Sequence, residues 1–380
     1  MPKSNQKTPK IAIVHDWLTN RGGAERVVLA FSEAFPDAPI FTSVYTPESL
    51  DWFHSKDVRT THLQNLPKPL RKLHKFFPML RVRAFRKLDL SDYDIILSSS
   101  SAESKQVRKT RPDQIHICYC HTPIRYYWSH YHEYKKDPGF GRLNFLVRLA
   151  MPFFVPPLKR ADYKAAQKVD LFLANSAETA KRIKKYYDRD ATVLHPPVDT
   201  KRFTPAKKRE DFYLSYSRQI PYKRVDLAIL ACNKLGLPLK VFGSGSEHEK
   251  LVAMAGPTIT FHPDDTDEVT KAYSTCKAFI FPPLEDFGIV PIEAQAAGAP
   301  VIAYGKGGAL ETVIDSQTGI LFPEQTPDSL AQAIQKSQKT TFSPIALKNN
   351  ANRFAQSLFI TKIRKIVSDA HASHFPKTKT

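Results

Sequence analysis

Short apolar runs alternate with amphipathic helical segments along most of this chain, and this alternation restricts its fold more than any other feature. The runs at residues 10–17, 93–100 and 114–121 are short and largely apolar, which is typical of strands buried on both faces. Residues 20–35 instead place apolar side chains at steps of three and four, as a helix does. Strands that alternate with helices form parallel sheets covered on both faces. The sequence therefore predicts an α/β fold.

The alternating pattern runs twice. A proline-rich, charged segment at 196–210 separates the two series, and at 380 residues the chain exceeds the roughly 250–300 residues that one core normally supports. We therefore predict two doubly wound, Rossmann-like domains. The expected boundaries are 1–195 for the N-terminal domain and 196–362 for the C-terminal domain. Residues 363–380 should form a helix and tail that pack back on the N-terminal domain.

Glu285 and Glu293 stand eight residues apart in a largely apolar stretch, PLEDFGIVPIEAQAAGAPVIA, at residues 283–303. An apolar run before it predicts a strand, and Pro291 and Gly298 suit the first turn and the end of a following helix. Glu285 should thus lie at the carboxyl end of the strand, and Glu293 about one turn into the helix. Open α/β sheets bind ligands at that edge.

A candidate anion site lies between the two glutamates. Free amides at the start of a helix attract phosphate, and Gly288 has no side chain to keep a ligand from the backbone. Hydroxyl-binding acids on both sides of a phosphate site suit a nucleotide-sugar. The alternative is that Glu293 only complements the helix dipole and Glu285 is a solvated loop residue. The amides concerned are those of Phe287, Gly288, Ile289 and Val290.

The spacing of Glu285 and Glu293 within EDFGIVPIEAQAAGAPVIAYGKGGALETV resembles the signature of glycosyltransferase family 4. Further segments resemble the same family in chain order: IAIVHDWLTNRGGAERVV, HICYCHTPIRYYW, ANSAETAKRIKKYY, PPVDTKRF and IPYKRVDLAI. The resemblance covers residues 10–365. It implies the GT-B fold, in which two Rossmann-like domains face each other across a cleft, and a retaining, metal-independent transferase. No cofactor is implied, because the nucleotide-sugar is itself a substrate.

The resemblance also implies roles on the donor side. It places Glu285 at the hydroxyls of the donor sugar, Glu293 at the ribose, and the amides of residues 287–290 at the sugar and diphosphate. Arg218 and Lys223 follow a strand end in SRQIPYKR, where two cations can neutralise a departing diphosphate. The alternative is that both are ordinary surface cations.

Candidates in the N-terminal domain follow strand ends as well. Gly22 and Gly23 form a strand-to-helix turn that the resemblance places beside the donor phosphates and the acceptor, although a lone pair of glycines predicts only a tight turn. His121 ends a strand, and Arg125 follows it closely. The resemblance implies that His121 contacts the transferring sugar or orients the acceptor, and that Arg125 binds substrate. A lone histidine at a strand end is otherwise most often structural.

The segment Asp92-Tyr93-Asp94 matches DxD, the metal-binding pattern of another glycosyltransferase class. It opens an expected strand, so we interpret it as a strand-entry turn. The histidines, cysteines and carboxylates show no other metal-ligand spacing. We therefore expect no metal site.

The formal net charge of +19 indicates an anionic partner. Residues 68–87 carry eight cations and no acid among leucines and phenylalanines, and residues 141–160 form a second basic, apolar stretch. Such segments lie well at anionic bilayer surfaces. The eight cations are Lys68, Arg71, Lys72, Lys75, Arg81, Arg83, Arg86 and Lys87. With the family resemblance, they predict an anionic membrane surface and a polyprenyl-diphosphate-linked saccharide acceptor as partners.

No apolar run approaches the ~20 residues of a spanning helix, and the N-terminal residues do not form a signal peptide. We expect a cytoplasmic protein held at the inner face of the cell membrane. The branch of family 4 with the greatest similarity contains O-antigen mannosyltransferases that use GDP-mannose. The implied function is hexosyl transfer, with mannose from GDP-mannose as the expected donor, to a lipid-linked oligosaccharide in cell-surface polysaccharide synthesis.

Two other functions would each agree with one feature of the sequence. A nucleic-acid-binding protein would suit the charge, but no helix-turn-helix, aromatic RNA-binding motif or finger spacing is present, so no specific nucleic acid is expected. A nicotinamide-dependent oxidoreductase would suit the fold class, but neither domain has GxGxxG after its first strand. A different sugar and a soluble acceptor both stay open.

Overall fold

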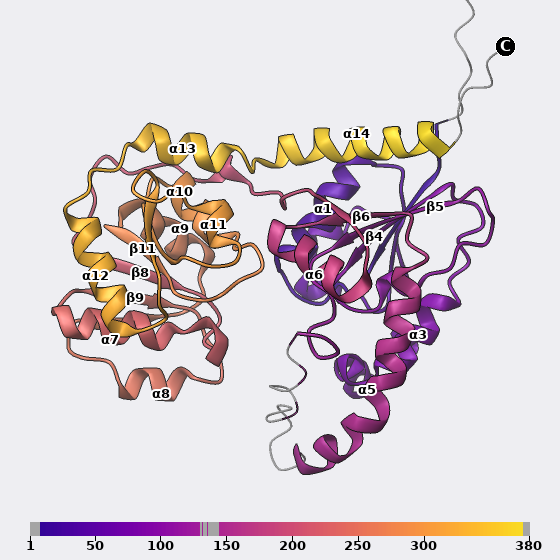
Figure 1. Ribbon diagram of the computed structural model, residues 1–380, viewed down its shortest axis with the longest axis horizontal. Coiled ribbons are helices and arrows are strands. Elements are labelled where there is room, and N and C mark those ends of the chain that lie inside the picture. Colours follow the sequence, from indigo (N-terminus) through magenta and orange to yellow (C-terminus); the bar gives the residue numbers. More distant parts are fainter. Residues whose placement is uncertain (1–7, 130, 132–134, 136–143, 375–380) are drawn as a thin grey trace, which may run out of the picture. The chain divides into compact units, whose positions relative to one another are not determined.

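The computed structural model describes residues 8–129, 131, 135 and 144–374, which divide into two compact units. One unit runs to His195 and takes up the chain again at Phe359, and the other is Pro196–Leu358. Each unit is a parallel sheet flanked by helices (Figure 1). The α/β class and the two Rossmann-like domains predicted from the sequence are thus confirmed.

The first unit is built on a seven-stranded parallel sheet of order β3-β2-β1-β4-β5-β6-β7. The strands are β1 (Ile11–His15), β2 (Ile40–Thr42), β3 (Val58–Thr60), β4 (Ile95–Ser100), β5 (Ile115–Cys120), β6 (Leu171–Ala174) and β7 (Ala191–Val193). Every residue of β1, β4 and β5 is buried, as expected for central strands. His15 pairs in register with Ser99, and Ser99 with Tyr119, so these three strands end at the same edge.

Helices cover both faces of this sheet. They are α1 (Gly23–Ala34), α2 (Lys68–Lys72), α3 (Pro78–Arg86), α5 (Asn144–Ala166), α6 (Ala177–Tyr187) and most of α14 (Gln356–His374). Single-turn helices in the unit are η1 (Pro47–Ser49), η2 (Asp51–Phe53), η3 (His62–Asn65), η4 (His74–Phe76) and η5 (Ser104–Gln106). No helix among the described residues is both long and apolar enough to cross a bilayer.

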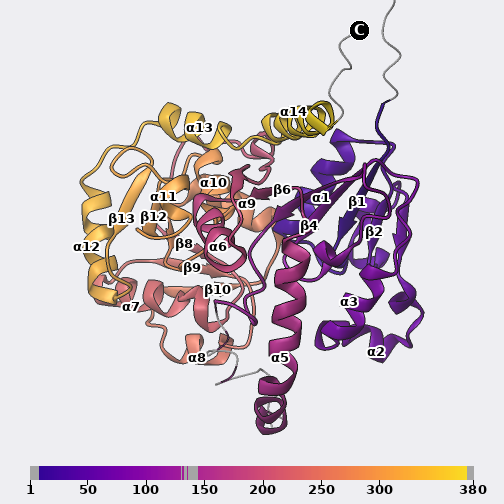
Figure 2. The same ribbon diagram turned by 45° about the vertical axis from the view of Figure 1, so that its right-hand side comes forward.

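The C-terminal helix α14 lies beside α1, as Figures 1 and 2 both show. Phe359, Ile363 and Val367, spaced four residues apart, are buried in the core of the first unit. Phe359 stacks on Phe31 of α1 with ring centroids 5.8 Å apart. Arg364 donates a hydrogen bond of 2.9 Å to the carbonyl of Ala34 at the end of α1. The apolar stripe of α14 therefore completes this core, although more than 160 residues of the other unit precede it in the chain.

The second unit has a six-stranded parallel sheet of order β10-β9-β8-β11-β12-β13. The strands are β8 (Tyr213–Tyr216), β9 (Leu239–Phe242), β10 (Ile259–His262), β11 (Ala278–Phe281), β12 (Val301–Tyr304) and β13 (Gly319–Phe322). The helices are α7 (Val225–Leu235), α8 (His248–Ala253), α9 (Thr266–Thr275), α10 (Val290–Ala296), α11 (Ala309–Thr312), α12 (Pro327–Gln338) and α13 (Pro344–Asn352), with single turns η7 (Thr200–Arg202) and η8 (Pro221–Lys223). Because β8 and β11 are neighbours in the sheet, the loop that follows β8 and the loop that follows β11 lie together at the carboxyl ends of these strands.

Candidate functional site

The first part of the candidate site lies in the second unit, where Lys223 and Glu285 form an ion pair. Lys223 ends η8 after β8, and Glu285 follows β11, so two adjacent strands deliver the partners. Their side chains are 15% and 18% exposed. The pair is therefore shielded from most solvent but can still be reached by a ligand.

The loop that carries Glu285 is held by a second loop, between β12 and α11. The amide of Gly308 donates a hydrogen bond of 2.9 Å to the carbonyl of Glu285. A Cβ at Gly308 would lie 2.2 Å from the Cα of Phe287, so no other residue fits without moving the loop. Gly308 was not singled out from the sequence, although the GG pair of the family signature was a signal for it.

The predicted anion site is a main-chain feature. Phe287 is buried and packs edge to face on Phe354, with centroids 5.5 Å apart, and Ile289 and Val290 pack against the same core. In the described part of the chain, the amides of Gly288 and Ile289 donate to no acceptor. These residues can therefore offer a ligand their backbone but not their side chains.

The structure explains why residue 288 is a glycine, which the sequence did not reveal. Its φ of +87° lies in the region that favours glycine, and a Cβ there would sit 3.1 Å from the ring of Phe281. The predicted close approach of a ligand is therefore not needed to explain this glycine. Pro291 lies in the first turn of α10, as predicted.

Glu293 lies in the first turn of α10 and is only 5% exposed, at the position predicted for it. The helix is fixed by the buried side-chain amide of Gln295, whose Nε2 donates a hydrogen bond of 2.8 Å to the main-chain carbonyl of Thr312. The side chain of Asn350 in α13 donates a hydrogen bond of 2.6 Å to Oε1 of Gln295. These contacts hold α10, and with it Glu293, rigidly against α11 and α13.

Arg218 lies in the same loop as Lys223, with its guanidinium exposed. It donates a hydrogen bond of 2.9 Å to the hydroxyl of Tyr222. Buried Gln219 anchors this loop by donating 2.7 Å to the carbonyl of Gly243, while His248 donates to its side-chain oxygen at 2.6 Å. The loop thus presents one exposed cation, Arg218, and one paired cation, Lys223, on a fixed base. The role of Gln219 could not be predicted from its sequence context.

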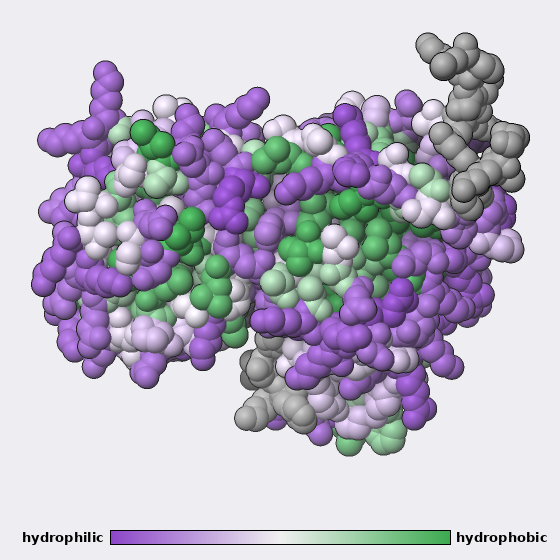
Figure 3. Space-filling view, turned by 45° about the horizontal axis from the view of Figure 1, so that its top comes forward, coloured by the Kyte–Doolittle hydropathy of each residue, from purple (hydrophilic) through white to green (hydrophobic). Residues whose placement is uncertain are grey.

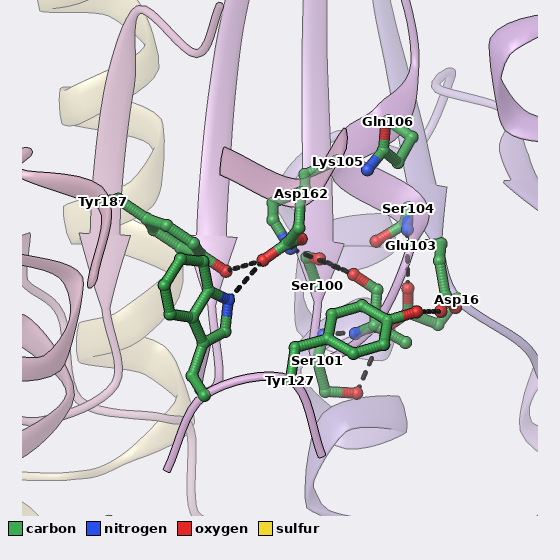
Figure 4. A network of polar contacts seen from close by, with 12 residues as sticks. Asp16, Ser100, Ser101, Glu103, Ser104, Lys105, Gln106, Tyr127, Asp162 and Tyr187 are labelled. Atoms are coloured by element: carbon green, nitrogen blue, oxygen red, sulfur yellow. Dashed lines mark hydrogen bonds and ion pairs between the residues drawn. The ribbon is translucent and has the colours of Figure 1, made fainter. Parts of the chain in front are cut away.

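In the first unit, His121 directly follows β5 and is hydrogen-bonded to Ser99, which also contacts His15 (Figure 4 shows the neighbouring polar network). Its Nε2 lies 2.8 Å from the Ser99 hydroxyl. The Nδ1 atom of His15 lies 3.1 Å from both the carbonyl and the hydroxyl oxygen of Ser99. The Nε2 atom of His15 lies 4.0 Å from Glu25, a buried acid in the first turn of α1.

These hydrogen bonds favour one tautomer of His121. A carbonyl can only accept, so Nδ1 of His15 is the donor toward Ser99. The Ser99 hydroxyl can then donate its proton to Nε2 of His121. This arrangement favours the tautomer of His121 that carries its proton on Nδ1.

We expect this tautomer to depend on Ser99. In protein carrying 15N-labelled histidine, with the signals of His121 assigned through His121→Gln, long-range 1H–15N spectra should show the Nδ1–H form. Ser99→Ala should give a mixture of tautomers. Ser98→Ala is the matched control, because it removes an equivalent 2.8 Å hydrogen bond from the adjacent residue to buried His116. An Nε2–H form in the unaltered protein would contradict the assignment.

Asp16 anchors the loop that follows β4, as Figure 4 shows. Its carboxylate accepts hydrogen bonds of 2.7–2.8 Å from the amides of Ser101, Ala102 and Ser104. Burial by itself would raise the pKa of Asp16, but the charge of His15 and these amides outweigh it and lower the pKa. The residue is thus a permanent anion that joins the ends of β1 and β4.

Gly22 caps α1 in an extended conformation and Gly23 begins the helix, so the predicted strand-to-helix turn is present. Glu25 in the same turn links it to His15, whose pKa is raised because Glu25 and Asp16 together outweigh the effect of burial. Arg125 lies half-buried in the turn after His121.

Two buried ion pairs brace the loop after β4. Lys105 lies 2.6 Å from Asp162, and Arg81 lies 2.7 Å from Glu103; every one of these side chains is at most 1% exposed. Figure 4 shows Tyr187 directed at Asp162, to which it donates at 2.7 Å. Arg81 is thus not one of the surface cations that the sequence predicted, because Glu103 holds it in the interior.

The DxD pattern has a structural explanation. Asp94 accepts a hydrogen bond of 2.9 Å from the amide of Lys10 and pairs with Arg111 at 2.8 Å, at the entry to β4. This agrees with a strand-entry turn. Within the described ranges, no group of three or more His, Cys, Asp or Glu side chains is arranged to hold a metal ion.

Comparison with known proteins identifies two matching families. Residues 21–202 match the family model for Glycosyltransferase Family 4, and residues 198–354 match the model for Glycosyl transferases group 1. Together the two models span residues 21–354 of the chain.

Several curated proteins are similar in sequence. D-inositol 3-phosphate glycosyltransferase of Mycobacteroides abscessus is 28% identical over 252 residues, which cover 57% of each chain. GDP-mannose-dependent alpha-(1-6)-phosphatidylinositol monomannoside mannosyltransferase of Mycobacterium tuberculosis is 32% identical over 172 residues, 37% of this chain and 45% of that protein. The chain spans about half the length of the curated relatives it matches.

Solved structures show the same architecture. Anabaena Alr3699/HepE in complex with UDP and glucose has a TM-score of 0.69 at 17% identity, covering 95% of this chain and 100% of that one. Sucrose-phosphate synthase from Thermosynechococcus elongatus has a TM-score of 0.71 at 18% identity, covering 96% and 100%. At these identities the likeness shows a shared fold alone.

Proposed function

We propose, on the premise that this chain belongs to the glycosyltransferases of family 4 with the GT-B fold, that it transfers a hexosyl group from a nucleotide-sugar with retention at the anomeric carbon. The observation that carries the proposal is the Lys223–Glu285 pair beside the exposed guanidinium of Arg218. A carboxylate that can bind sugar hydroxyls and two cations that can bind a diphosphate stand on adjacent strand ends. The test is transfer from a nucleotide-sugar, and absence of both transfer and nucleotide-sugar binding would refute the proposal.

On the donor side, Glu285 accepts hydrogen bonds from the sugar hydroxyls and Glu293 from the ribose. Lys223 and Arg218 face the diphosphate, where negative charge grows as the glycosidic bond breaks. The main chain of residues 287–290 binds the sugar and phosphate oxygens. The ion pair and the two unpartnered amides support this arrangement, because they provide acceptors and donors in a loop of fixed shape.

On the acceptor side, His121 donates a hydrogen bond from Nδ1 to a hydroxyl of the transferring sugar. Its tautomer supports a donor role rather than that of a general base, because the Nε2 lone pair is occupied by Ser99. The donor phosphate then accepts the acceptor's proton. Gly22 and Gly23 lie beside the phosphates and the acceptor, and Arg125 binds substrate, as in the family resemblance.

We further propose that Arg218 stabilises the leaving group. Arg218→Ala should lower kcat about 10²-fold, the usual effect of losing one charge-stabilising donor. Arg218→Lys should recover part of the rate. Tyr222→Phe is the control, because it removes the hydroxyl that binds Arg218 but keeps the cation. Initial rates at saturating donor decide the matter, and an Arg218→Ala rate equal to that of the unaltered protein would exclude this role.

Because Arg218 and Lys223 can neutralise the diphosphate, we also propose that the reaction needs no metal ion. We expect EDTA to leave the initial rate unchanged after prior removal of divalent ions. A loss that Mg²⁺ or Mn²⁺ restores would show that a metal takes part.

The proposed donor is GDP-mannose. The similar mannosyltransferase of Mycobacterium tuberculosis is GDP-mannose-dependent, whereas the similar fold in HepE holds UDP, so the base must be tested directly. A donor present at 100 times its Kd stabilises the fold by about 2.7 kcal/mol, a Tm rise of roughly 5–10 °C. GDP-mannose should give the largest rise in a panel with GDP, UDP and UDP-glucose. A larger rise in Tm with UDP-glucose would show that GDP-mannose is not the preferred donor.

The proposed acceptor is a lipid-linked oligosaccharide at the inner face of the membrane, in cell-surface polysaccharide synthesis. Exposed hydrophobic side chains of the first unit support it: Leu70, Leu73, Phe76, Phe77, Met79 and Leu80 from α2 to α3, and Phe145, Leu149, Phe153 and Phe154 on α5. On the face that it draws, Figure 3 shows hydrophobic patches within a mainly hydrophilic surface. Burial of Arg81 and Phe85 makes the first basic segment smaller than predicted, and residues 141–143 of the second lie outside the described chain.

A further inference from the structure

A pocket of about 440 Å³ opens on the first unit between α3 and α5. Four cations line it: Arg83, Arg86 and Lys87 from the end of α3, and Arg108 from the loop after η5. The rest of the lining is apolar, from Met79 and Val82 on α3 and Pro157, Leu158 and Ala161 on α5. The pocket belongs to neither part of the candidate site described above.

The four cations of this pocket lack an acidic partner in the part of the chain that the structure describes. Arg81, earlier on the same helix, has its own acid in Glu103 and lies outside the pocket. The pocket therefore concentrates positive charge that a bound anion could neutralise.

Arg86 is held in place for such an anion. Its Nε and Nη2 atoms donate to the side-chain oxygen of Gln106 at 3.2 and 2.8 Å, which fixes the plane of the guanidinium. Burial and the nearby charge of Arg108 both lower the pKa of Arg86, since each disfavours the charged form. An anion bound here would relieve both effects.

The apolar lining continues beyond the pocket along one face of α5. Phe153 and Phe154 lie four residues before Pro157 and Leu158, so each pair shares a helix face. Leu149 precedes Phe153 by the same step. The side chains of Leu149, Phe153 and Phe154 are 68%, 73% and 54% exposed. A hydrocarbon chain leaving the pocket would find apolar surface along this face.

We propose that the pocket binds a phosphate or diphosphate carried on a hydrocarbon chain, with the four cations at the phosphate and the α5 face along the chain. A phosphomonoester or diphosphate carries about two or more negative charges, which suit four cations better than the single charge of a phosphodiester. Two ligands with a hydrocarbon chain meet this description. The assignment to a polyisoprenyl diphosphate depends on the acceptor in the proposed function, whereas the assignment to phosphatidic acid, a glycerophospholipid with a phosphomonoester, does not.

Isothermal titration of the full chain tests the proposal with three probes: farnesyl diphosphate, dihexanoyl phosphatidic acid below its micelle concentration, and inorganic pyrophosphate. At least one amphiphile should bind ten times more tightly than pyrophosphate, and the tighter amphiphile identifies the ligand. No binding of either amphiphile, or equal affinity for pyrophosphate, overturns the proposal.

Variants place the binding in this pocket. The triple variant Arg83→Gln, Lys87→Gln, Arg108→Gln changes only exposed side chains and should weaken amphiphile binding at least tenfold. Its control is Lys168→Gln, Lys181→Gln, Lys185→Gln, which removes three exposed charges from the same unit outside the pocket and should bind as the unaltered protein does. Equal affinity of the two triple variants overturns the assignment. Neither measurement uses a sugar donor. Binding in the pocket can therefore be shown even if no sugar transfer is found, and sugar transfer can be shown even if the pocket binds no amphiphile.

Discussion

Glu285→Ala is expected to lower kcat by about 10²–10³-fold, the range seen when one preorganised electrostatic contact at the reacting centre is lost. The carboxylate is both the proposed acceptor for sugar hydroxyls and the partner of Lys223, so the change also leaves a cation unpaired. The fold should persist, because the pair is partly exposed and sits in a loop held by main-chain contacts. Initial rates, together with the near-UV spectrum, separate the two effects.

The matched control for Glu285 is Asp226→Asn. Asp226 also pairs with a cation of this region, Arg224, at 3.0 Å, and has a comparable exposure. Its loss should change the rate by less than about twofold, since surface ion pairs contribute little. If Glu285→Ala leaves turnover unchanged, or Asp226→Asn lowers it equally, then Glu285 has no special role in the reaction.

Lys105→Met should have the largest effect on stability. It leaves the Asp162 carboxylate buried without its cation, which typically lowers the free energy of unfolding by about 3–5 kcal/mol. Burial alone would lower the pKa of Lys105, but Asp162 outweighs it and raises the pKa, so the pair is charged in the folded protein. Hydrogen bonds to Asp162 from Trp128 and Tyr187 should place the loss near the lower end of that range.

Urea unfolding followed by tryptophan fluorescence measures this loss in the right unit, because Trp17, Trp52 and Trp128 all lie before His195. Lys109→Met is the control: it makes the same substitution four residues away, at a pair with Asp170 whose side chains are 28% and 36% exposed. We expect a loss of at most about 1 kcal/mol there. Equal losses for the two variants would mean that burial of Lys105 carries no special cost.

The alternation of strands and helices was predictable because it is a local property. A buried strand needs a short apolar run and a covering helix needs apolar steps of three and four, whatever the rest of the chain does. The position of Glu293 in the first turn of α10 follows from such local signals. The strand β3, Val58–Thr60, escaped prediction because it is a short edge strand with two exposed residues and no apolar run.

Contacts between distant segments were beyond local reasoning. Lys223 and Glu285 pair because β8 and β11 are neighbours in the sheet, and strand order is not written in either segment. The sequence predicted Arg81 to be one of eight surface cations, but in the folded protein it is buried in an ion pair with Glu103. Ser99, which favours one tautomer of His121, gave no signal in a run of four serines.

The sequence by itself therefore determined the fold class and the residues that supply charge and hydroxyl-binding groups, since these depend on periodicity and residue type. Only the tertiary structure decided which of those charges are buried, which are paired and which stay uncompensated. The physical reason is that the energy of a charge depends on its neighbours and its access to water, and parallel strands take those neighbours from segments far apart in the chain.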